Sequence, residues 1–339
     1  MIDLLVIGGG PVGLMTAIHA RLAGLEVVVL ERRRSQPDKA CGEGLMPDAL
    51  RRLHAVGVDP AGMDFGGIAY VAPGRRATAR FADGTGRGVR RTVLRAALEA
   101  RAEELGAVIV DGRVDEVANG EQGVVVNGVE ARYAVAADGL HSPVREQVGL
   151  ARPAGRTRRY GARRHYRIAP WDDVVEVHWS ERAEVYLTPV GPELVGVAVL
   201  GPRPLSFDDV VDCCPEVRSR LAGAAPVGTT RGAGPLLQPT SRRTRGRVLL
   251  VGDAAGYVDA LTGEGLRLGF AEAEAAVIAV LTEDPASYER AWRSLTRPYR
   301  LLTHGLLAAA SFAPTRRAIV PAASRAPWAF RRAVDVLAG

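Results

Sequence analysis

A glycine-rich turn close to the N-terminus constrains the fold more than any other feature of the chain. Residues 2–7 form an apolar run rich in Leu, Val and Ile, which is typical of a parallel strand buried on both faces, and the turn Gly8–Gly13 follows directly. Residues 13–24 have helical periodicity, and residues 27–30 predict a second strand. This β-α-β unit indicates a doubly wound α/β sheet.

The turn has the spacing of a dinucleotide-binding motif. Gly8 allows the tight turn, Gly10 lets the backbone approach a pyrophosphate, and Gly13 lets the helix pack closely on the strand. The helix start at Pro11-Val12 offers free N–H groups to a phosphate. Glu31 ends the second strand, where its carboxylate can accept hydrogen bonds from a ribose diol. This context favours a dinucleotide site over the alternative, a purely structural glycine turn.

Two further turns each follow an apolar strand. Asp138-Gly139 comes after the strand expected at 131–136, and Gly252-Asp253 comes after the strand expected at 248–251. Either turn alone is usually structural. The Asp253 carboxylate can bind a sugar hydroxyl, and a glycine-flanked helix start, in a helix expected from about Gly263 to Leu281, can present N–H groups to a pyrophosphate or a flavin carbonyl.

In this order, the three motifs resemble those of the flavoprotein hydroxylase superfamily, whose fold is that of p-hydroxybenzoate hydroxylase, over nearly the whole chain. The resemblance implies non-covalent FAD, NAD(P)H as electron donor, Asp253 on the ribityl chain, and Gly263 to Leu266 along the isoalloxazine. Arg91 matches a family arginine near the FAD phosphates; taken alone, it is equally well a solvated helix start. The residues expected to contact FAD are Gly8, Gly10, Pro11, Val12, Gly13, Glu31, Arg32, Cys41, Gly42, Arg91, Asp138, Gly139, Gly252, Asp253, Gly263, Gly265 and Leu266.

A fourth motif, PDKACGEGL at residues 37–45, resembles the K-x-C-G-x-G-L segment of geranylgeranyl reductase-like flavoenzymes, as does TGEGL at 262–266. Lys39 is the only lysine among 44 Lys and Arg residues, which indicates that a compact ammonium is needed there. Cys41 beside it is a candidate proton donor near the flavin. The alternative is that Cys41 is a small residue packed under the flavin. Lys39 and Cys41 are the candidate catalytic residues, and we expect the loop 37–46 to lie against the flavin with Cys41 on its flavin-facing side.

Two departures from the reductase pattern bear on the substrate. The branch carries an aromatic signature (Y/F)-x-W-x-F-P, whereas residues 184–189 read EVYLTP, and the W-x-W-x-I-P signature of tryptophan halogenases is absent too. The loss argues against a long isoprenoid substrate and leaves Tyr186 and Thr188 as candidate substrate contacts in an apolar pocket under the flavin. Ala260 stands where many hydroxylases have a proline.

The cofactor motifs lie at the start, middle and end of the chain, which predicts a discontinuous FAD-binding domain of residues 1–62, 88–152 and 244–295. An inserted antiparallel-sheet substrate domain is expected at residues 63–87 and 153–243. The C-terminal segment 296–339 is expected to be helical and interrupted by Pro298, Pro314, Pro321 and Pro327.

Composition excludes several other classes of function. No apolar run is long enough to predict a transmembrane helix, and three cysteines, Cys41, Cys213 and Cys214, suggest a reducing cytoplasm instead of a disulfide framework. The net charge of +6 comes from scattered arginines without a nucleic-acid motif. No metal-ligand spacing is present, and His165 and His178, in expected strands, are interpreted as structural.

Three functions are compatible with these patterns. The first is an NAD(P)H-dependent monooxygenase of a small aromatic or polyketide-like substrate, which the loss of the aromatic signature favours. The second is a flavin-dependent C=C reductase of an apolar small molecule, in which Cys41 supplies a proton. The third is a flavoprotein without redox turnover.

Overall fold

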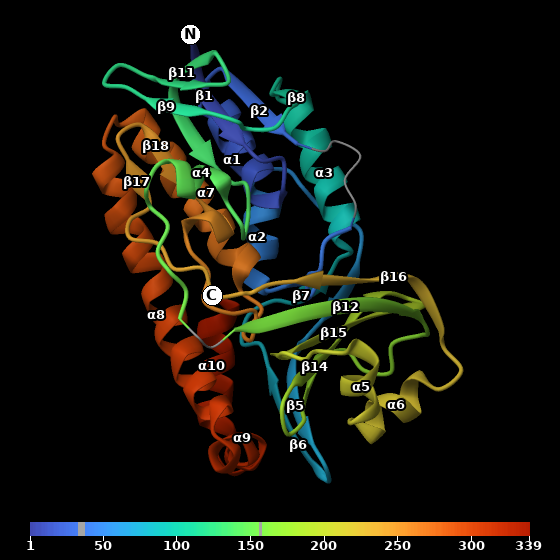
Figure 1. Ribbon diagram of the computed structural model, residues 1–339. Helices are drawn as coiled ribbons and strands as arrows, with labels where there is room; N and C mark the ends of the chain where they lie inside the picture. The colour runs from blue at the N-terminus through green and yellow to red at the C-terminus, as the bar shows by residue number, and fades with distance from the viewer. Residues whose placement is uncertain (33–37, 156–157) are drawn as a thin grey trace.

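A largely parallel sheet with a buried centre forms one end of the molecule (Figure 1). The computed structural model describes residues 1–32, 38–155 and 158–339. β1 (Ile2–Ile7) lies at the centre of an eight-stranded sheet, parallel to both of its neighbours. The strand order is β17 (Thr244–Arg245), β18 (Val248–Leu250), β11 (Val129–Ala136), β1, β2 (Val27–Glu31) and β8 (Val108–Asp111), with β10 (Val124–Val126) and β9 (Val117–Asn119) as a side hairpin on β11.

Helices cover this sheet. α1 (Pro11–Leu22) packs against α3 (Arg91–Glu104) and α7 (Gly265–Leu281), and α2 (Pro47–Ala55) packs against α7. All side chains from Leu4 to Ile7 are buried, which explains why the strand is a continuous apolar run without alternation. Two short elements, α4 (Pro143–Gln147) and the 3₁₀ helix η1 (Gly252–Ala255), follow β11 and β18.

A second sheet of seven strands forms the other end of the molecule. Its order is β16 (Ala225–Ala233), β12 (Arg159–Arg167), β15 (Leu194–Pro202), β14 (Glu184–Gly191), β13 (Val175–Trp179), β5 (Gly67–Ala72) and β6 (Arg75–Arg80). Its neighbours are antiparallel except β5 and β13. α5 (Phe207–Asp212) and α6 (Pro215–Leu221) pack on one face, and a small sheet of β3 (Gly44–Leu45), β7 (Gly86–Gly88) and β4 (Met63–Phe65) contacts β14. The expected fold class is confirmed.

The C-terminal helices differ from expectation at two of the four prolines. α8 (Pro285–Ser311) runs from the first sheet towards the second, followed by α9 (Ala313–Arg325) and α10 (Pro327–Ala338) (Figure 1). Pro314 and Pro327 lie in the first turns of their helices, where no N–H partner is needed. Pro298 and Pro321 lie inside helices, so the expected interruptions there were wrong. Tertiary packing of the buried stripe on α8, which includes Trp292 and Tyr299, offsets the lost hydrogen bond.

Among the described residues, no helix is long and apolar enough to cross a bilayer. Those residues likewise contain no cluster of three His, Cys, Asp or Glu side chains able to hold a metal ion. Cys213 ends α5 and Cys214 caps α6, and all three cysteines are free thiols.

Candidate functional site

The three glycine motifs follow three adjacent parallel strands. Ile7 pairs with Ala136, and Ala136 pairs with Leu250, so β1, β11 and β18 end in register. The turns at Gly8, Asp138 and Gly252 therefore leave the same edge of the sheet. The carboxyl edge of such a sheet is where this class of fold binds nucleotides.

The glycines of the first turn are required by close backbone contacts. A Cβ on Gly13 would lie 1.8 Å from the Gly8 carbonyl oxygen, and a Cβ on Gly8, which has φ +106°, would lie 2.5 Å from the Ala137 carbonyl oxygen. The turn is thus pressed between α1 and the loop that contains Asp138-Gly139. Beside Gly10 the nearest atom to such a Cβ would be Arg91 Nη2 at 3.9 Å, so this surface is open to a phosphate group.

Side chains around the turn complete a nucleotide-binding edge. The Glu31 carboxylate Oε2 accepts a hydrogen bond from the Gly9 N–H at 2.6 Å, and Arg95 Nε donates to the Gly9 carbonyl at 3.1 Å. Pro11 is the first residue of α1, and Val12 packs against Gly252. The N-terminus of α1 and the Glu31 carboxylate therefore flank one face, as a dinucleotide requires.

Charged side chains from four segments meet at this edge. Burial raises the pKa of Asp253, and the positive charges of Arg91, Lys39 and Arg145 oppose this rise. Burial lowers the pKa of Lys39; the charges of Arg91 and Arg32 lower it further, and that of Glu31 opposes them. The structure thus brings Lys39, Arg91 and Asp253 together with the first glycine turn. Lys39 and Asp253 are more than 200 residues apart in sequence.

Arg145 joins the second and third motifs, a role that the sequence analysis missed. Its side chain is 2% exposed; Nη1 donates to the carbonyls of Asp253 at 3.3 Å and Ala254 at 3.2 Å, and Nη2 donates to the Leu140 carbonyl at 2.9 Å. The only sequence signal was its place in the helix start SPVR after Asp138-Gly139. Burial raises the pKa of Asp138, whose Oδ2 accepts from the Val144 N–H.

The N-cap and the body of α7 each contribute one buried acid. Glu264 is the N-cap residue of α7, and burial raises its pKa to about 7 although Arg267 lies beside it. Burial raises the pKa of Glu272 to about 8, and its Oε2 accepts from the Gly252 N–H at 2.6 Å. Gly263 has φ +72°, a backbone conformation that favours glycine. Gly265 and Leu266 begin the helix, so their N–H groups face the same edge.

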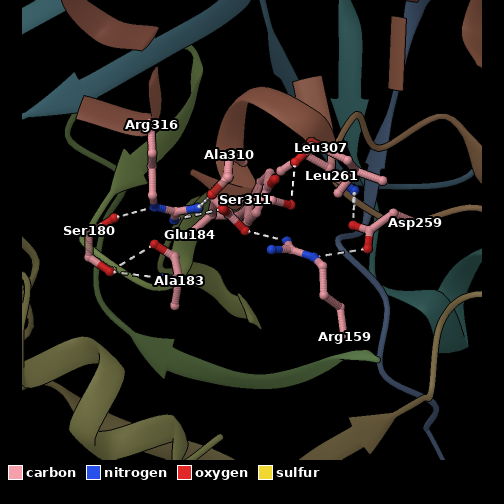
Figure 2. Close-up of polar contacts among 11 residues, drawn as sticks. Arg159, Ser180, Ala183, Glu184, Asp259, Leu261, Leu307, Ala310, Ser311 and Arg316 are labelled. Carbon is pink, nitrogen blue, oxygen red and sulfur yellow. Dashed lines mark hydrogen bonds and ion pairs between the residues drawn. The ribbon is translucent and has the colours of Figure 1, made fainter. Parts of the chain in front are cut away.

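Buried ion pairs fix the preceding loop from the second sheet and the C-terminal helices (Figure 2). Arg159 on β12 binds Asp259 at 3.0 Å and Glu184 at 2.5 Å, and Glu184 also binds Arg316 of α9 at 2.7 Å. The four charges alternate in sign along this chain. Asp259 Oδ1 in turn accepts from the Leu261 N–H at 3.0 Å. These contacts restrict the loop around Ala260, where many hydroxylases have a proline.

The two candidate substrate residues lie against the predicted flavin loops. The Tyr186 hydroxyl donates to the Leu261 carbonyl at 2.7 Å, and the Thr188 hydroxyl donates to the Gly42 carbonyl at 2.9 Å. Tyr186 packs in an apolar cluster with Phe65 and Trp179. Their contact with substrate stays a prediction.

The loop around Cys41 is held by side chains from the second sheet. Cys41 is half-buried, and its sulfur accepts from the Glu43 N–H at 3.5 Å. His165 Nε2 lies 2.6 Å from Glu43 Oε2, which supports the structural interpretation of His165; the sequence analysis missed Glu43 altogether. Pro37, the first residue of the expected loop, lies outside the described residues.

The residues present fit FAD. The glycine cradle and the N-terminus of α1 suit a pyrophosphate, Glu31 suits the adenosine ribose, and Asp253 suits the ribityl hydroxyls. The N-terminus of α7 offers further N–H donors. Comparison with known proteins agrees, because residues 1–69 and 87–180 match a family described as FAD binding domain.

Two curated relatives are archaeal reductases. The Methanococcus vannielii digeranylgeranylglycerophospholipid reductase is 27% identical over 290 residues, covering 78% of this chain and 73% of the relative. Digeranylgeranylglycerophospholipid reductase 1 of Methanopyrus kandleri is 30% identical over 321 residues, covering 84% of this chain and 83% of the relative.

Two other relatives carry different names. A rifampicin monooxygenase of Streptomyces venezuelae is 35% identical over 172 residues, covering 45% of this chain and 35% of the relative. A dialkyldecalin synthase of Streptomyces rugosporus is 30% identical over 301 residues, covering 80% of this chain and 63% of the relative.

A solved flavoprotein/dehydrogenase from Cytophaga hutchinsonii has a TM-score of 0.85 at 18% identity, covering 99% of this chain and 92% of that chain, and shares the fold. The motifs, the fold and the coverage of the archaeal reductases agree. This chain is an FAD-dependent oxidoreductase of the flavoprotein hydroxylase superfamily and belongs to its geranylgeranyl reductase-like branch.

Proposed function

We propose that this protein reduces a carbon–carbon double bond of an apolar small molecule. The observation that carries the proposal is the half-buried thiol of Cys41, which lies in a loop whose backbone is held on both sides. We propose that this thiol faces the cofactor edge, the carboxyl edge of the first sheet where the turns at Gly8, Asp138 and Gly252 lie. The Methanococcus vannielii and Methanopyrus kandleri relatives, which cover about three quarters or more of this chain, are named as reductases. Their names favour this function over the hydroxylase that the missing aromatic signature had favoured.

The chain's own residues would bind the cofactor, exclude water and supply the proton. FAD, when bound, would supply a hydride to one alkene carbon, and NAD(P)H would restore the reduced cofactor. Cys41 would give its proton to the other carbon, so that two hydrogens are added and the thiolate is left to be reprotonated from solvent. Arg163 and Tyr257 lie within electrostatic reach of the thiol, and Arg163 would stabilise the thiolate.

Aromatic packing supports a small substrate. Between the second sheet and α10, the ring of Tyr70 contacts Trp179 at 5.3 Å and Phe330 at 4.6 Å between centroids. These rings occupy the interior beside Tyr186, where a long chain would need open space. We therefore propose a short apolar or aromatic alkene as substrate.

The second candidate is a monooxygenase, supported by the match to the rifampicin monooxygenase. The two functions differ in their need for oxygen. Purified FAD-loaded protein, reduced with NADH or NADPH, would be offered a panel of apolar alkenes and phenols with and without O₂. A product that gains two hydrogens without O₂ supports the reductase, whereas a product that gains oxygen only in air supports the monooxygenase. Turnover of neither kind would favour the third, non-redox function.

A further inference from the structure

Side chains from the second sheet hold the backbone on both sides of Cys41. On one side, Arg163 Nη2 donates to the Lys39 carbonyl at 3.0 Å. On the other side, Thr188 donates to the Gly42 carbonyl at 2.9 Å. Arg163 also pairs with both carboxylate oxygens of Asp38, at 2.8 and 2.5 Å. Cys41 is therefore the centre of a loop that is fixed at each end.

Glu43 is a buried acid of this loop. It is 3% exposed and has φ +60°, a left-handed conformation that is strained for a non-glycine residue. Its Oε2 lies 2.6 Å from His165 Nε2, and its Oε1 accepts from the N–H of Arg91 at 3.0 Å. The carboxylate thus joins the Cys41 loop to the second sheet and to the start of α3, where Arg91 faces the cofactor edge.

The Glu43 carboxylate lies over a position of the second sheet that has no side chain, Gly196. Thr188, Gly196 and His165 form one row across β14, β15 and β12. A Cβ on Gly196 would lie only 3.2 Å from Glu43 Oε2. Any side chain at this position would contact the carboxylate closely. Gly196 therefore leaves room for the carboxylate between Thr188 and His165.

Hydrogen bonding assigns the proton on His165. Arg163 Nη1 lies 2.9 Å from His165 Nδ1, and a guanidinium can only donate, so Nδ1 must accept. Nε2 therefore carries a proton and donates it to Glu43. Asp38, Arg163, His165 and Glu43 form a continuous series of donors and acceptors, buried from Arg163 onwards, which makes the position of Glu43 specific.

We propose that Glu43 is a positioning residue that sets the place of the Cys41 thiol relative to the cofactor edge. The proposal rests on the proposed function only for the use of that thiol as an acid. Displacement of a reacting group by about 1 Å can cost on the order of a hundredfold in rate. A strained residue with two buried donors is suited to prevent such displacement.

The test compares Glu43→Gln with a matched control, Glu176→Gln. Glutamine keeps the size of Glu43 but has one acceptor oxygen, so either the Arg91 N–H or the His165 Nε2–H loses its partner. Glu176 is also buried and also pairs with a histidine of the same sheet, His178, at 2.9 Å, but makes none of the contacts to the Cys41 loop. Both variants should lose stability for the same reason.

The direct readout is alkylation of Cys41 by iodoacetamide in the FAD-loaded protein, followed by peptide mass spectrometry because Cys213 is exposed and also reacts. We expect Glu43→Gln to change the Cys41 rate about tenfold, the equivalent of one lost hydrogen bond to a charged group. Glu176→Gln should leave that rate within twofold. Equal effects of the two variants, or no effect of Glu43→Gln, would overturn the proposal.

A second variant allows the test if Glu43→Gln does not fold, and a kinetic measurement gives an independent readout. If Glu43→Gln does not fold with FAD, Gly196→Ala displaces the same carboxylate from the sheet side and should change the Cys41 rate in the same way. In the enzyme assay, Glu43→Gln should slow product formation while leaving flavin reduction by NAD(P)H unchanged. If no alkene is reduced by the unmodified protein, the proposed function fails, and the alkylation rates still decide the role of Glu43.

Discussion

The cofactor edge and the second sheet differ in the residues that shape them and in the pKa values of their buried acids. At the cofactor edge, glycines and helix N-termini shape the backbone, and its acids Glu264 and Glu272 have pKa values raised by burial to about 7 and about 8. In the second sheet, buried acids are paired. Burial alone would raise the pKa of Glu176, but hydrogen bonds from His178 and Arg76 outweigh burial and lower the pKa to about 2. At the cofactor edge, burial outweighs the partners of the acids, whereas at Glu176 the partners outweigh burial.

The largest difference between the regions should appear when an acid of the second sheet is removed. Glu184→Ala leaves Arg159 and Arg316 buried without their shared anion, which should cost about 3–5 kcal/mol of unfolding free energy. Urea unfolding of the FAD-loaded protein measures this loss. The exposed pair Glu181–Arg317 is the control, and Glu181→Ala should change stability by less than about 1 kcal/mol. A small effect of Glu184→Ala would mean that the network in Figure 2 does not support the fold.

At the cofactor edge, removal of an acid should affect the ligand more than the fold. Asp253→Ala removes a carboxylate that we expect to bind the ribityl chain, and should weaken FAD binding by roughly 1.5–3 kcal/mol. Because burial raises the pKa of Asp253, its loss should not destabilise the protein without FAD. Titration with FAD gives the affinity, and urea unfolding without FAD gives the stability. Unchanged FAD affinity would contradict the placement of the flavin.

The same contrast explains what the sequence could predict. Backbone requirements leave glycines at fixed spacing, so β1, the turn Gly8–Gly13 and the later Gly252-Asp253 were placed from sequence, and the expected helix near 263–281 is α7, Gly265–Leu281. Ion pairs such as Glu43–His165 join residues 122 positions apart and have no local pattern. Pro298 inside α8 shows the same limit, since tertiary packing outweighed a local signal.

The two regions should respond to pH in opposite directions. The pKa of Glu272 is about 8 in the folded protein and 4.5 ordinarily, so folding is favoured by its protonation. Its contribution is complete below pH 4.5 and is lost as the pH rises towards 8, by at most about 1.4 kcal/mol per pH unit. Glu176, with a pKa of about 2, stabilises the fold above pH 4.5 and loses this effect as the pH falls towards 2.

Glutamine variants separate the two contributions. Glu272→Gln should flatten the stability curve between pH 4.5 and 8, and Glu176→Gln should flatten it below pH 4.5, as measured by urea unfolding across the pH range. If Glu272→Gln changes only the acidic side, the environment assigned to this carboxyl is wrong.

The smallest expected effect compares two tyrosines with equal hydrogen bonds. The hydroxyl of Tyr186 donates to the Leu261 carbonyl and that of Tyr288 to the Leu250 carbonyl, each at 2.7 Å. Replacement of either by Phe removes one hydrogen bond and should cost about 1 kcal/mol of stability. Leu261 lies in the loop expected beside the flavin ring, whereas Leu250 ends a core strand. Tyr186→Phe should therefore shift the flavin absorption spectrum or the substrate KM, and Tyr288→Phe should change neither. Equal spectra and KM values for both variants would place Tyr186 among the structural residues and remove it from the substrate site.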